Sequence, residues 1–164
     1  MKKIVSLKKG FTLLEILLVV GIIAILAGIV ILAINPSKQL GDTRNAQRRS
    51  DVLSIANAVY QYMIDNNGTA PVTIPTTGTC GALATLIATS SATSTAIGSV
   101  DLYTTLVTAS STYLNAMTRD PLASTSTGYG VLRSTATGRI TVCAPLSLGE
   151  GSIASGGTMI SITR

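Results

Sequence analysis

Residues 8–26 read KKGFTLLEILLVVGIIAIL, a basic start followed by an apolar run in which Glu15 is the only charged residue. The apolar run extends from Phe11 to Ile34. As a helix, about 24 residues span roughly 36 Å, which exceeds the ~30 Å hydrocarbon core of a bilayer. The run therefore predicts a membrane-spanning helix at residues 11–34.

The flanks of this run indicate its orientation and its class. Lysines precede it without any acidic residue, at Lys2, Lys3, Lys8 and Lys9. Because basic flanks stay on the cytoplasmic side, the rest of the chain is expected outside. A secretory signal peptide has a shorter apolar core, about 7 to 15 residues, and a small-x-small cleavage site, which the closing sequence LAINPS fits poorly. A simple membrane anchor explains the length and the lysines, but it does not explain the carboxylate.

Glu15 needs a counter-charge. A carboxylate costs on the order of 2.5 kcal/mol or more at the centre of a bilayer and requires a partner. Glu15 lies one helical turn beyond Phe11, just inside the membrane surface. Cleavage between Gly10 and Phe11 would create a terminal amine of opposite charge. Since the start of the helix is already positive, this amine suits the carboxylate of a neighbouring chain better than that of its own chain.

Residues 8–15, KKGFTLLE, resemble the class III leader and N-terminal methylation motif of type IV pilins and type II secretion pseudopilins. The resemblance implies that residues 1–10 are a leader peptide, which a prepilin peptidase removes by cutting after Gly10 on the cytoplasmic side. It also implies that the peptidase methylates Phe11 and that Glu15 aligns an incoming subunit with the terminal amine of another subunit. A partner chain then compensates the buried charge.

The net charge changes once the leader is removed. The formal charge of +5 reflects 12 Lys and Arg against 7 Asp and Glu, but residues 11–164 carry eight basic and seven acidic side chains. The high pI therefore does not indicate a nucleic-acid-binding surface. A small basic cluster is expected on a solvated helix face just outside the membrane or facing acidic headgroups, and consists of Lys38, Arg44, Arg48 and Arg49, with Asp42 and Asp51 between them. Nucleic acid stays open as a partner, supported by this patch alone.

The helix is expected to continue outside the membrane as residues 35–67. Apolar residues at spacings of three and four predict one buried face, formed by Val52, Ile55, Val59, Tyr62 and Met63. The other faces are assigned to polar residues, namely Arg48, Arg49, Asp51, Asn57 and Gln61.

Proline and glycine mark the two ends of this second half. Pro36 lacks an N–H and its ring opposes the carbonyl of Leu32, so a kink or a loosened turn is predicted there. At the other end, Asn66-Asn67-Gly68 predicts the helix terminus, with Gly68 suited to a left-handed cap.

Residues 68–164 are expected to form a globular α+β head. Short β-rich segments at 129–133, 139–143 and 158–162 predict an antiparallel sheet of three or four strands. Short helices are expected at 81–88 and from Ser99 or Asp101 onward. The predicted fold is thus α+β, with a long N-terminal helix, apolar in its first half and amphipathic in its second, and a C-terminal antiparallel sheet packed on it.

The chain contains two Cys and no His. In an extracellular location, Cys80 and Cys143 are expected to form one disulfide, and two buried free thiols are the alternative. Without His there is no Ser-His or Cys-His couple, and no phosphate-binding Gly-x-x-x-x-Gly-Lys motif occurs. Asp101, Asp120 and Glu150 show no spacing that suggests catalysis, and the last two are too few to predict a calcium site. We therefore expect a protein that is not an enzyme, with no catalytic residue, no cofactor and no metal.

These patterns and the resemblance predict a structural subunit of a type IV pilus-like filament, assembled through the apolar helix. The expected partners are further copies in a helical filament, the prepilin peptidase, the pilus assembly machinery and the inner membrane before assembly. The precursor would be a single-pass protein of the cytoplasmic membrane with a cytoplasmic N-terminus, and the filament would lie at the cell surface. Two alternatives stay open: a pseudopilin of a type II secretion system, and an uncut, membrane-tethered extracellular binding module.

Overall fold

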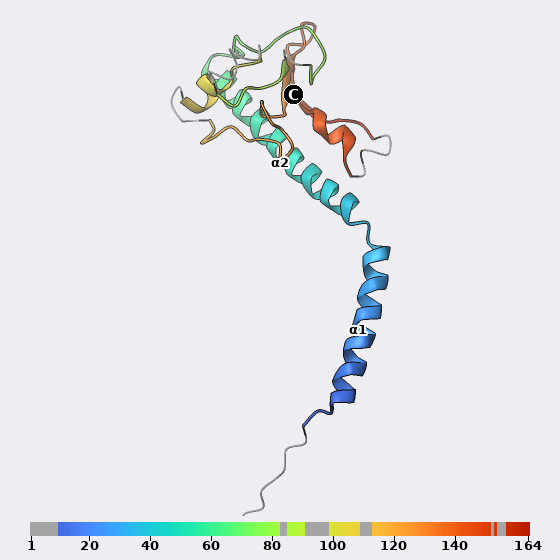
Figure 1. Cartoon of the computed structure of the whole chain (residues 1–164). Coiled ribbons are helices and arrows are strands. Elements are labelled where there is room, and N and C mark those ends of the chain that lie inside the picture. The colour runs from blue at the N-terminus through green and yellow to red at the C-terminus, as the bar shows by residue number, and fades with distance from the viewer. Residues whose placement is uncertain (1–9, 83–84, 91–98, 109–112, 152, 154–156) are drawn as a thin grey trace, which may run out of the picture. The chain divides into compact units, whose positions relative to one another are not determined.

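The computed structural model describes residues 10–82, 85–90, 99–108, 113–151, 153 and 157–164. The chain forms two compact units, Met1–Pro36 and Ser37–Arg164. The first contains the apolar helix α1 (Leu13–Ala33). The second contains most of α2 (Pro36–Asp65) and a three-stranded sheet, and we call it the head (Figure 1).

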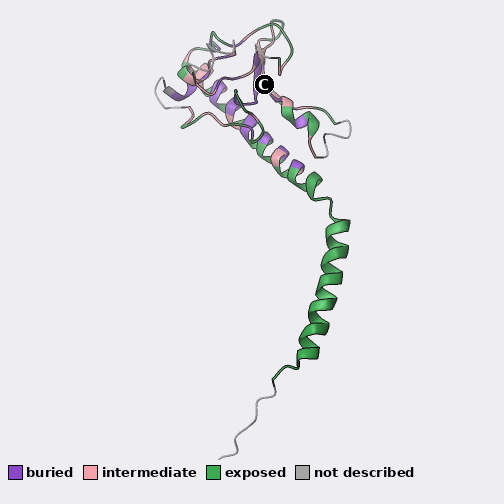
Figure 2. Ribbon diagram, viewed as in Figure 1, coloured by how far each residue is buried: buried purple, intermediate pink, exposed green. Residues whose placement is uncertain are grey.

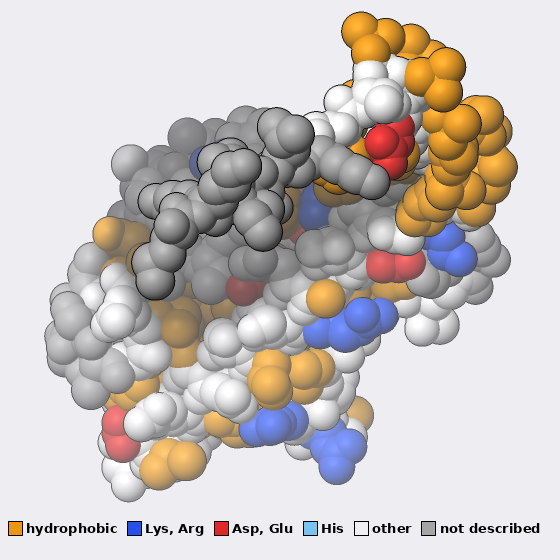
Figure 3. Space-filling model, turned by 90° about the horizontal axis from the view of Figure 1, so that it is seen from below, with side chains coloured by type: hydrophobic (Ala, Val, Ile, Leu, Met, Phe, Trp, Pro, Cys, Tyr) orange, Lys and Arg blue, Asp and Glu red, His pale blue; other side chains and the backbone are white. Residues whose placement is uncertain are grey.

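Helix α1 is apolar and fully exposed. Its most apolar stretch of 18 residues has a mean hydropathy of 3.3, and none of its 21 residues is buried, as the uniform exposed colouring shows (Figure 2). Hydrophobic side chains gather along this helix in the space-filling view (Figure 3). Among the described residues it is the one helix whose length and composition would allow it to cross a membrane. The helix starts two residues later than the expected start at Phe11 because Thr12 caps it.

The two helices are separate elements. Ile34 adopts an extended conformation and caps α1 by donating its N–H to the carbonyl of Val30, and α2 begins at Pro36. Proline disfavours helical backbone in the residue before it, here Asn35, and its own fixed φ suits the first position of a helix. The interruption lies where Pro36 was expected to kink or loosen the chain.

Helix α2 buries one stripe and ends at a left-handed cap. Its buried residues include Val52, Ile55 and Val59, as the apolar spacing predicted. At the C-terminal end, the N–H of Gly68 bonds to the carbonyl of Met63 at 2.7 Å. This bond closes a Schellman-type cap. Asn67 and Gly68 both have positive φ, 53° and 82°.

The sheet is antiparallel with strand order β1 (Gly130–Arg133), β2 (Ile140–Ala144) and β3 (Ile160–Thr163). Val131 pairs with Val142, which pairs with Ile162, so these three side chains share one face. On the other face, Thr141 and Thr163 share a hydrogen bond of 2.8 Å. The sheet face and the stripe of α2 belong to one apolar core, which confirms the α+β prediction.

Two local predictions in the head have different outcomes. A short helical segment at Thr104–Thr108 follows the buried Leu102, as expected for a helix after Asp101. The helix expected at 81–88 is wrong at its end, because Leu86 and Ile87 form isolated β-bridges with Gly130 and Val100. Residues 83–84 of that prediction lie outside the described residues.

A disulfide joins the loop after α2 to the central strand. Cys80 and Cys143 are bonded, with Cα atoms 6.3 Å apart and 63 residues of separation in the chain. Cys143 is completely buried. The alternative of two free thiols is therefore excluded, since the chain has no other Cys.

Candidate functional site

The start of α1 carries three of the predicted site residues. Gly10 and Phe11 precede the helix, and the Phe11 side chain is 80% exposed. A Cβ placed on Gly10 would meet nothing within 4 Å. The fold of this chain therefore does not itself require glycine at position 10.

Thr12 fixes the position of Glu15 at the start of the helix. The Thr12 hydroxyl accepts a hydrogen bond from the Glu15 backbone N–H at 3.2 Å. Thr-x-x-Glu is the spacing of a capping box, in which a threonine satisfies a free N–H of the first helical turn. A carboxylate in this turn is also favoured by the positive end of the helix. Glu15 is thus held in the exposed first turn of α1.

A second set of interacting polar residues is buried in the head. Arg48 on α2 is completely buried and binds two carboxylates from distant parts of the chain. Its Nη1 lies 2.7 Å from Oε2 of Glu150 and 2.8 Å from the side-chain oxygen of Asn45. Two further nitrogens contact Asp120 at 2.5 and 2.9 Å. Arg48 therefore links α2 to the loop before β1 and to the loop before β3.

Arg44 and Asn45 complete the contacts of Glu150. Arg44 forms a 2.7 Å ion pair with Oε1 of Glu150, and the amide of Asn45 donates to the Glu150 backbone carbonyl at 3.0 Å. Burial opposes the charge of Glu150, but the hydrogen bonds from Arg48 and Arg44 outweigh it and lower the pKa of this carboxyl. The hydrogen bond with Asp120 raises the pKa of Arg48 despite the burial of its guanidinium. Arg48 and Glu150 are thus held in their charged forms.

Tyr129 and Asp51 form a hydrogen-bonded pair next to this network, and the charges of Asp120 and Arg48 act on Tyr129. The Tyr129 hydroxyl, on a fully buried side chain, donates to Oδ2 of Asp51 at 2.6 Å. Burial raises the pKa of Tyr129 far above its ordinary value, and the Asp51 carboxylate raises it further. We call Arg44, Asn45, Arg48, Asp51, Asp120, Tyr129 and Glu150 the buried polar network.

Close backbone packing brings the members of this network together. A Cβ on Gly41 of α2 would collide with the backbone of Gly151, so only glycine allows the loop that carries Glu150 to approach the helix this closely. Gly128 has φ +80° and sits against Asp120, where a Cβ would also collide. These two glycines position the two carboxylates next to Arg48.

The structure corrects the expectation of a solvated basic face. Arg48 and Asp51 are buried, and Arg44 is bound to Glu150. The sequence contained a usable signal, because Arg48 precedes Val52 by four residues and therefore lies on the same helical stripe. Extending that stripe toward the N-terminus would have placed Arg48 on the buried face of α2. What a helix pattern could not show is which distant acids would meet it.

The predicted site residues fall into three separate places. Gly10, Phe11 and Glu15 lie together in the first unit, Pro36 opens α2, and Cys80 and Cys143 are joined in the head. Within the described residues, no group of three or more His, Cys, Asp or Glu side chains converges as a metal site would require. Asp120 and Glu150 do approach one point, but the guanidinium of Arg48 occupies it.

Comparison with known proteins identifies the N-terminal motif. Residues 6–31 match the model of the prokaryotic N-terminal methylation motif. Over 60 residues, the chain is 38% identical to type II secretion system core protein G from Aeromonas hydrophila, Pectobacterium carotovorum subsp. carotovorum and Escherichia coli (strain K12). The aligned stretch covers 37% of this chain and 41%, 37% and 40% of those proteins, respectively. No solved structure matches the chain.

The motif that matches contains the predicted cleavage and assembly residues Gly10, Phe11 and Glu15. The apolar helix and the α+β head are the elements expected from the same resemblance. The chain therefore carries a prokaryotic N-terminal methylation motif and is similar, over 60 residues, to type II secretion system core protein G.

Proposed function

We propose that this chain is a structural subunit of a type IV pilus-like helical filament, assembled through α1 after residues 1–10 are removed. The observation that carries the proposal is α1 itself, which is exposed along its whole length although its most apolar 18 residues have a mean hydropathy of 3.3. Such a surface must be covered by lipid or by other apolar helices. A membrane-stored subunit that later enters a helix bundle meets both requirements in turn.

The geometry around Gly10 supports cleavage by a peptidase. Gly10 has open space around it and Phe11 is 80% exposed and precedes the first helical turn. The fold does not need glycine at position 10. Any requirement for glycine there would therefore come from recognition by the peptidase. The proposed sequence of events is a cut after Gly10 and methylation of the new Phe11 amine by a prepilin peptidase.

Glu15 supports assembly through a neighbouring copy. The cut creates a positive amine at Phe11, and Glu15 is held in the first turn of the same helix. A carboxylate in an apolar surrounding is stable when a partner supplies the opposite charge. Glu15 of an incoming copy would meet the Phe11 amine of a copy already in the filament, which fixes the register between the two helices.

The proposed partners and locations follow from this role. They are further copies of the chain, the prepilin peptidase, the assembly machinery and the cytoplasmic membrane, in which the precursor has its N-terminus inside. We propose no enzymatic activity. Nucleic acid is not among the proposed partners, because Arg44 and Arg48 are bound to Glu150 and Asp120.

The decisive experiment is N-terminal sequencing and intact-mass measurement of the protein recovered from its own cells. A chain that begins at Phe11 with one added methyl group is the expected result. An intact Met1, or a cut near Ala33, would overturn the proposal and would favour a membrane-tethered extracellular binding module or a secreted protein.

A second candidate function is that of a type II secretion pseudopilin. The three relatives favour it, since all are named core protein G of that system. Both candidates share processing and assembly, so the test must address the filament. Electron microscopy of the cells would show long surface filaments for a pilus subunit. For a pseudopilin, deletion of the chain would instead retain exported proteins inside the cell.

A further inference from the structure

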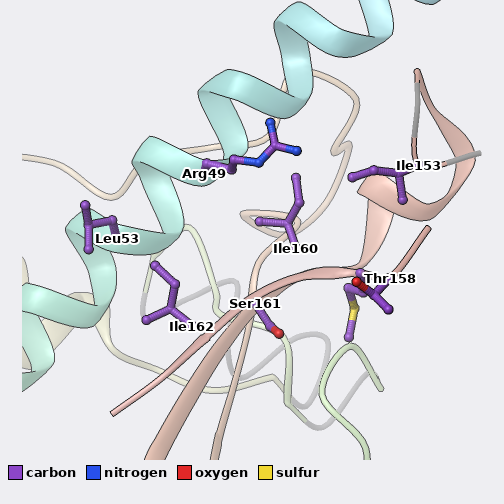
Figure 4. Close-up of a pocket in the computed structure, with 8 residues that line it drawn as sticks. Arg49, Leu53, Ile153, Thr158, Ile160, Ser161 and Ile162 are labelled. Carbon is purple, nitrogen blue, oxygen red and sulfur yellow. The ribbon is translucent and has the colours of Figure 1, made fainter.

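An open groove of about 570 Å³ lies between α2 and strand β3 in the head (Figure 4). Leu53 of α2 and Ile160 and Ile162 of β3 supply apolar walls, and Arg49 extends from α2 beside them (Figure 4). Leu53 is 39% exposed, so this apolar surface is open to a partner.

Strand β3 is the edge of the sheet along this groove. It pairs with β2 on one side, and no strand pairs with its other side within the described residues. Ile140 and Arg164 exchange two backbone hydrogen bonds. In an antiparallel ladder, the N–H and C=O groups of the preceding residue, Thr163, therefore point to the outer edge, as do those of Ser161. Such groups readily pair with another chain.

Arg49 adds a charge to this groove. It is exposed and has no hydrogen-bond or ion-pair partner among the described residues, in contrast to the adjacent Arg48. A partner that covers the groove would remove water from the guanidinium, which is favourable only if the partner supplies an anion. The groove therefore fits a surface that presents a carboxylate.

The head itself carries one suitable carboxylate. Of the acids described in it, Asp65 alone is exposed. Asp42 and Asp101 are half-buried, and Asp51, Asp120 and Glu150 belong to the buried polar network. The Tyr113 hydroxyl donates to Asp65 at 2.8 Å and orients it. Asp65 follows Arg49 by 16 residues on α2, which places it about 24 Å along the helix and roughly 160° around it. The two charges therefore cannot pair within one copy.

We infer that the Arg49 groove of one copy binds the Asp65 end of α2 in the next copy. The two surfaces lie on opposite sides of the same helix, so the contact is heterologous and leaves each copy with a free groove and a free Asp65. Such contacts repeat without closing and build an open helical array. The inference rests on the proposed filament role and assigns the head surfaces that meet in it.

Cysteine cross-linking tests the contact in full-length protein expressed in its own cells. The chain with Arg49→Cys and Asp65→Cys should give a ladder of dimers, trimers and longer species with a short bismaleimide linker. Cys80 and Cys143 do not react, because they are joined to each other. Cells that express Arg49→Cys and Asp65→Cys on separate copies should give dimers but no longer species, because each copy then carries a single reactive cysteine. The matched control, Arg139→Cys with Asp65→Cys, replaces another exposed arginine and should give no ladder.

Each contrary outcome has a distinct meaning. Dimers from Arg49→Cys alone would show a symmetric contact and overturn the inference. Filaments without cross-links would overturn it while the proposed function stands. A chain left uncut at Gly10 would overturn the proposed function, and the inference with it.

Charge reversal covers the case in which the cysteine variants do not assemble. Arg49→Glu and Asp65→Lys should each lower filament yield by at least about tenfold, because each places like charges at the contact. The double reversal should restore the yield. Two deficient single variants without recovery in the double variant would overturn the inference.

Discussion

Arg48 on α2 and Asp120 in the loop before β1 are joined by two hydrogen bonds, Nε to Oδ2 at 2.5 Å and Nη2 to Oδ1 at 2.9 Å. Both side chains are completely buried although 72 residues separate them in the chain. The ion pair fixes that loop to the middle of the helix.

Replacement of Arg48 should destabilise the head strongly. Arg48→Met keeps much of the side-chain volume but leaves the Asp120 carboxylate buried without its counter-charge. Breaking a buried ion pair in this way costs about 3 to 5 kcal/mol of unfolding free energy. The measurement is urea unfolding of the full chain in detergent, followed by the near-ultraviolet circular dichroism of its tyrosines.

The adjacent arginine provides the matched control. Arg49→Met removes the same charge from an exposed position and should change the unfolding free energy by less than about 0.5 kcal/mol. Equal losses in the two variants would contradict the assignment of a special role to Arg48.

Removal of the Tyr129 hydroxyl should also destabilise the head. Tyr129→Phe keeps the ring in the core but leaves the buried Asp51 carboxylate without its 2.6 Å donor. An unsatisfied buried acceptor costs about 1 to 3 kcal/mol. Thermal unfolding at pH 7 measures this loss, and Tyr60→Phe, at a half-buried position on α2, is the control.

The same variant should alter the response to alkaline pH. The pKa of Tyr129 is raised in the folded state, so its contribution to stability is fully present below the unfolded value of about 10 and is lost as the pH rises above it. The stability difference between the native chain and Tyr129→Phe should therefore shrink above about pH 10. A difference that stays constant between neutral and strongly alkaline pH would contradict this.

Glu150 should control the response to acid. Its pKa is lowered in the folded state by Arg48 and Arg44, so its contribution is present above the unfolded value of about 4.3 and is lost as the pH falls through the folded value. Glu150→Gln should be less stable than the native chain at pH 7, and the two should converge in acid. Parallel stability curves over this range would show that the charge of Glu150 is unimportant.

Loss of the disulfide should lower the stability of the head at every pH. Replacing both Cys80 and Cys143 by Ser opens a loop with a sequence separation of 63 residues. In the chain-entropy account, this costs about 4 kcal/mol. A fall in the melting temperature, reproduced in the native chain by a reductant, is the expected result, and the doubly substituted chain should not respond to the reductant.

Loss of the Glu15 carboxylate should block assembly and leave processing intact. Glu15→Ala retains Gly10 and Phe11, so cleavage and methylation should proceed, but the amine of the neighbouring copy loses its partner. Incorporation of Glu15→Ala into filaments should fall by at least about tenfold. Incorporation of Glu15→Asp, which keeps the charge, should decrease less. Immunoblots of sheared filaments and of membranes measure both steps. Normal incorporation of Glu15→Ala would refute the role of this residue.

The sequence by itself determined the elements that depend on local pattern. Helix α1 follows from an apolar run in which Glu15 is the only charged residue, the break before α2 from Pro36, and the cap after Asp65 from Asn67 and Gly68. The alternation of apolar and polar residues predicted the three strands within about two residues of their observed ends, because a strand with one buried face has a period of two. The N-terminal methylation motif could also be identified directly, since its residues are contiguous.

Only the tertiary structure decided which distant residues meet. From the sequence, Arg48 is expected to be exposed to solvent because it is charged. The residues next to it in the sequence do not indicate that Asp120 and Glu150 will enclose it. A buried charge is stable when folding delivers its partners, and those partners lie in loops that Gly41 and Gly128 allow to approach the helix. Local pattern therefore specified the helices and strands, whereas long-range packing specified the polar network that joins them.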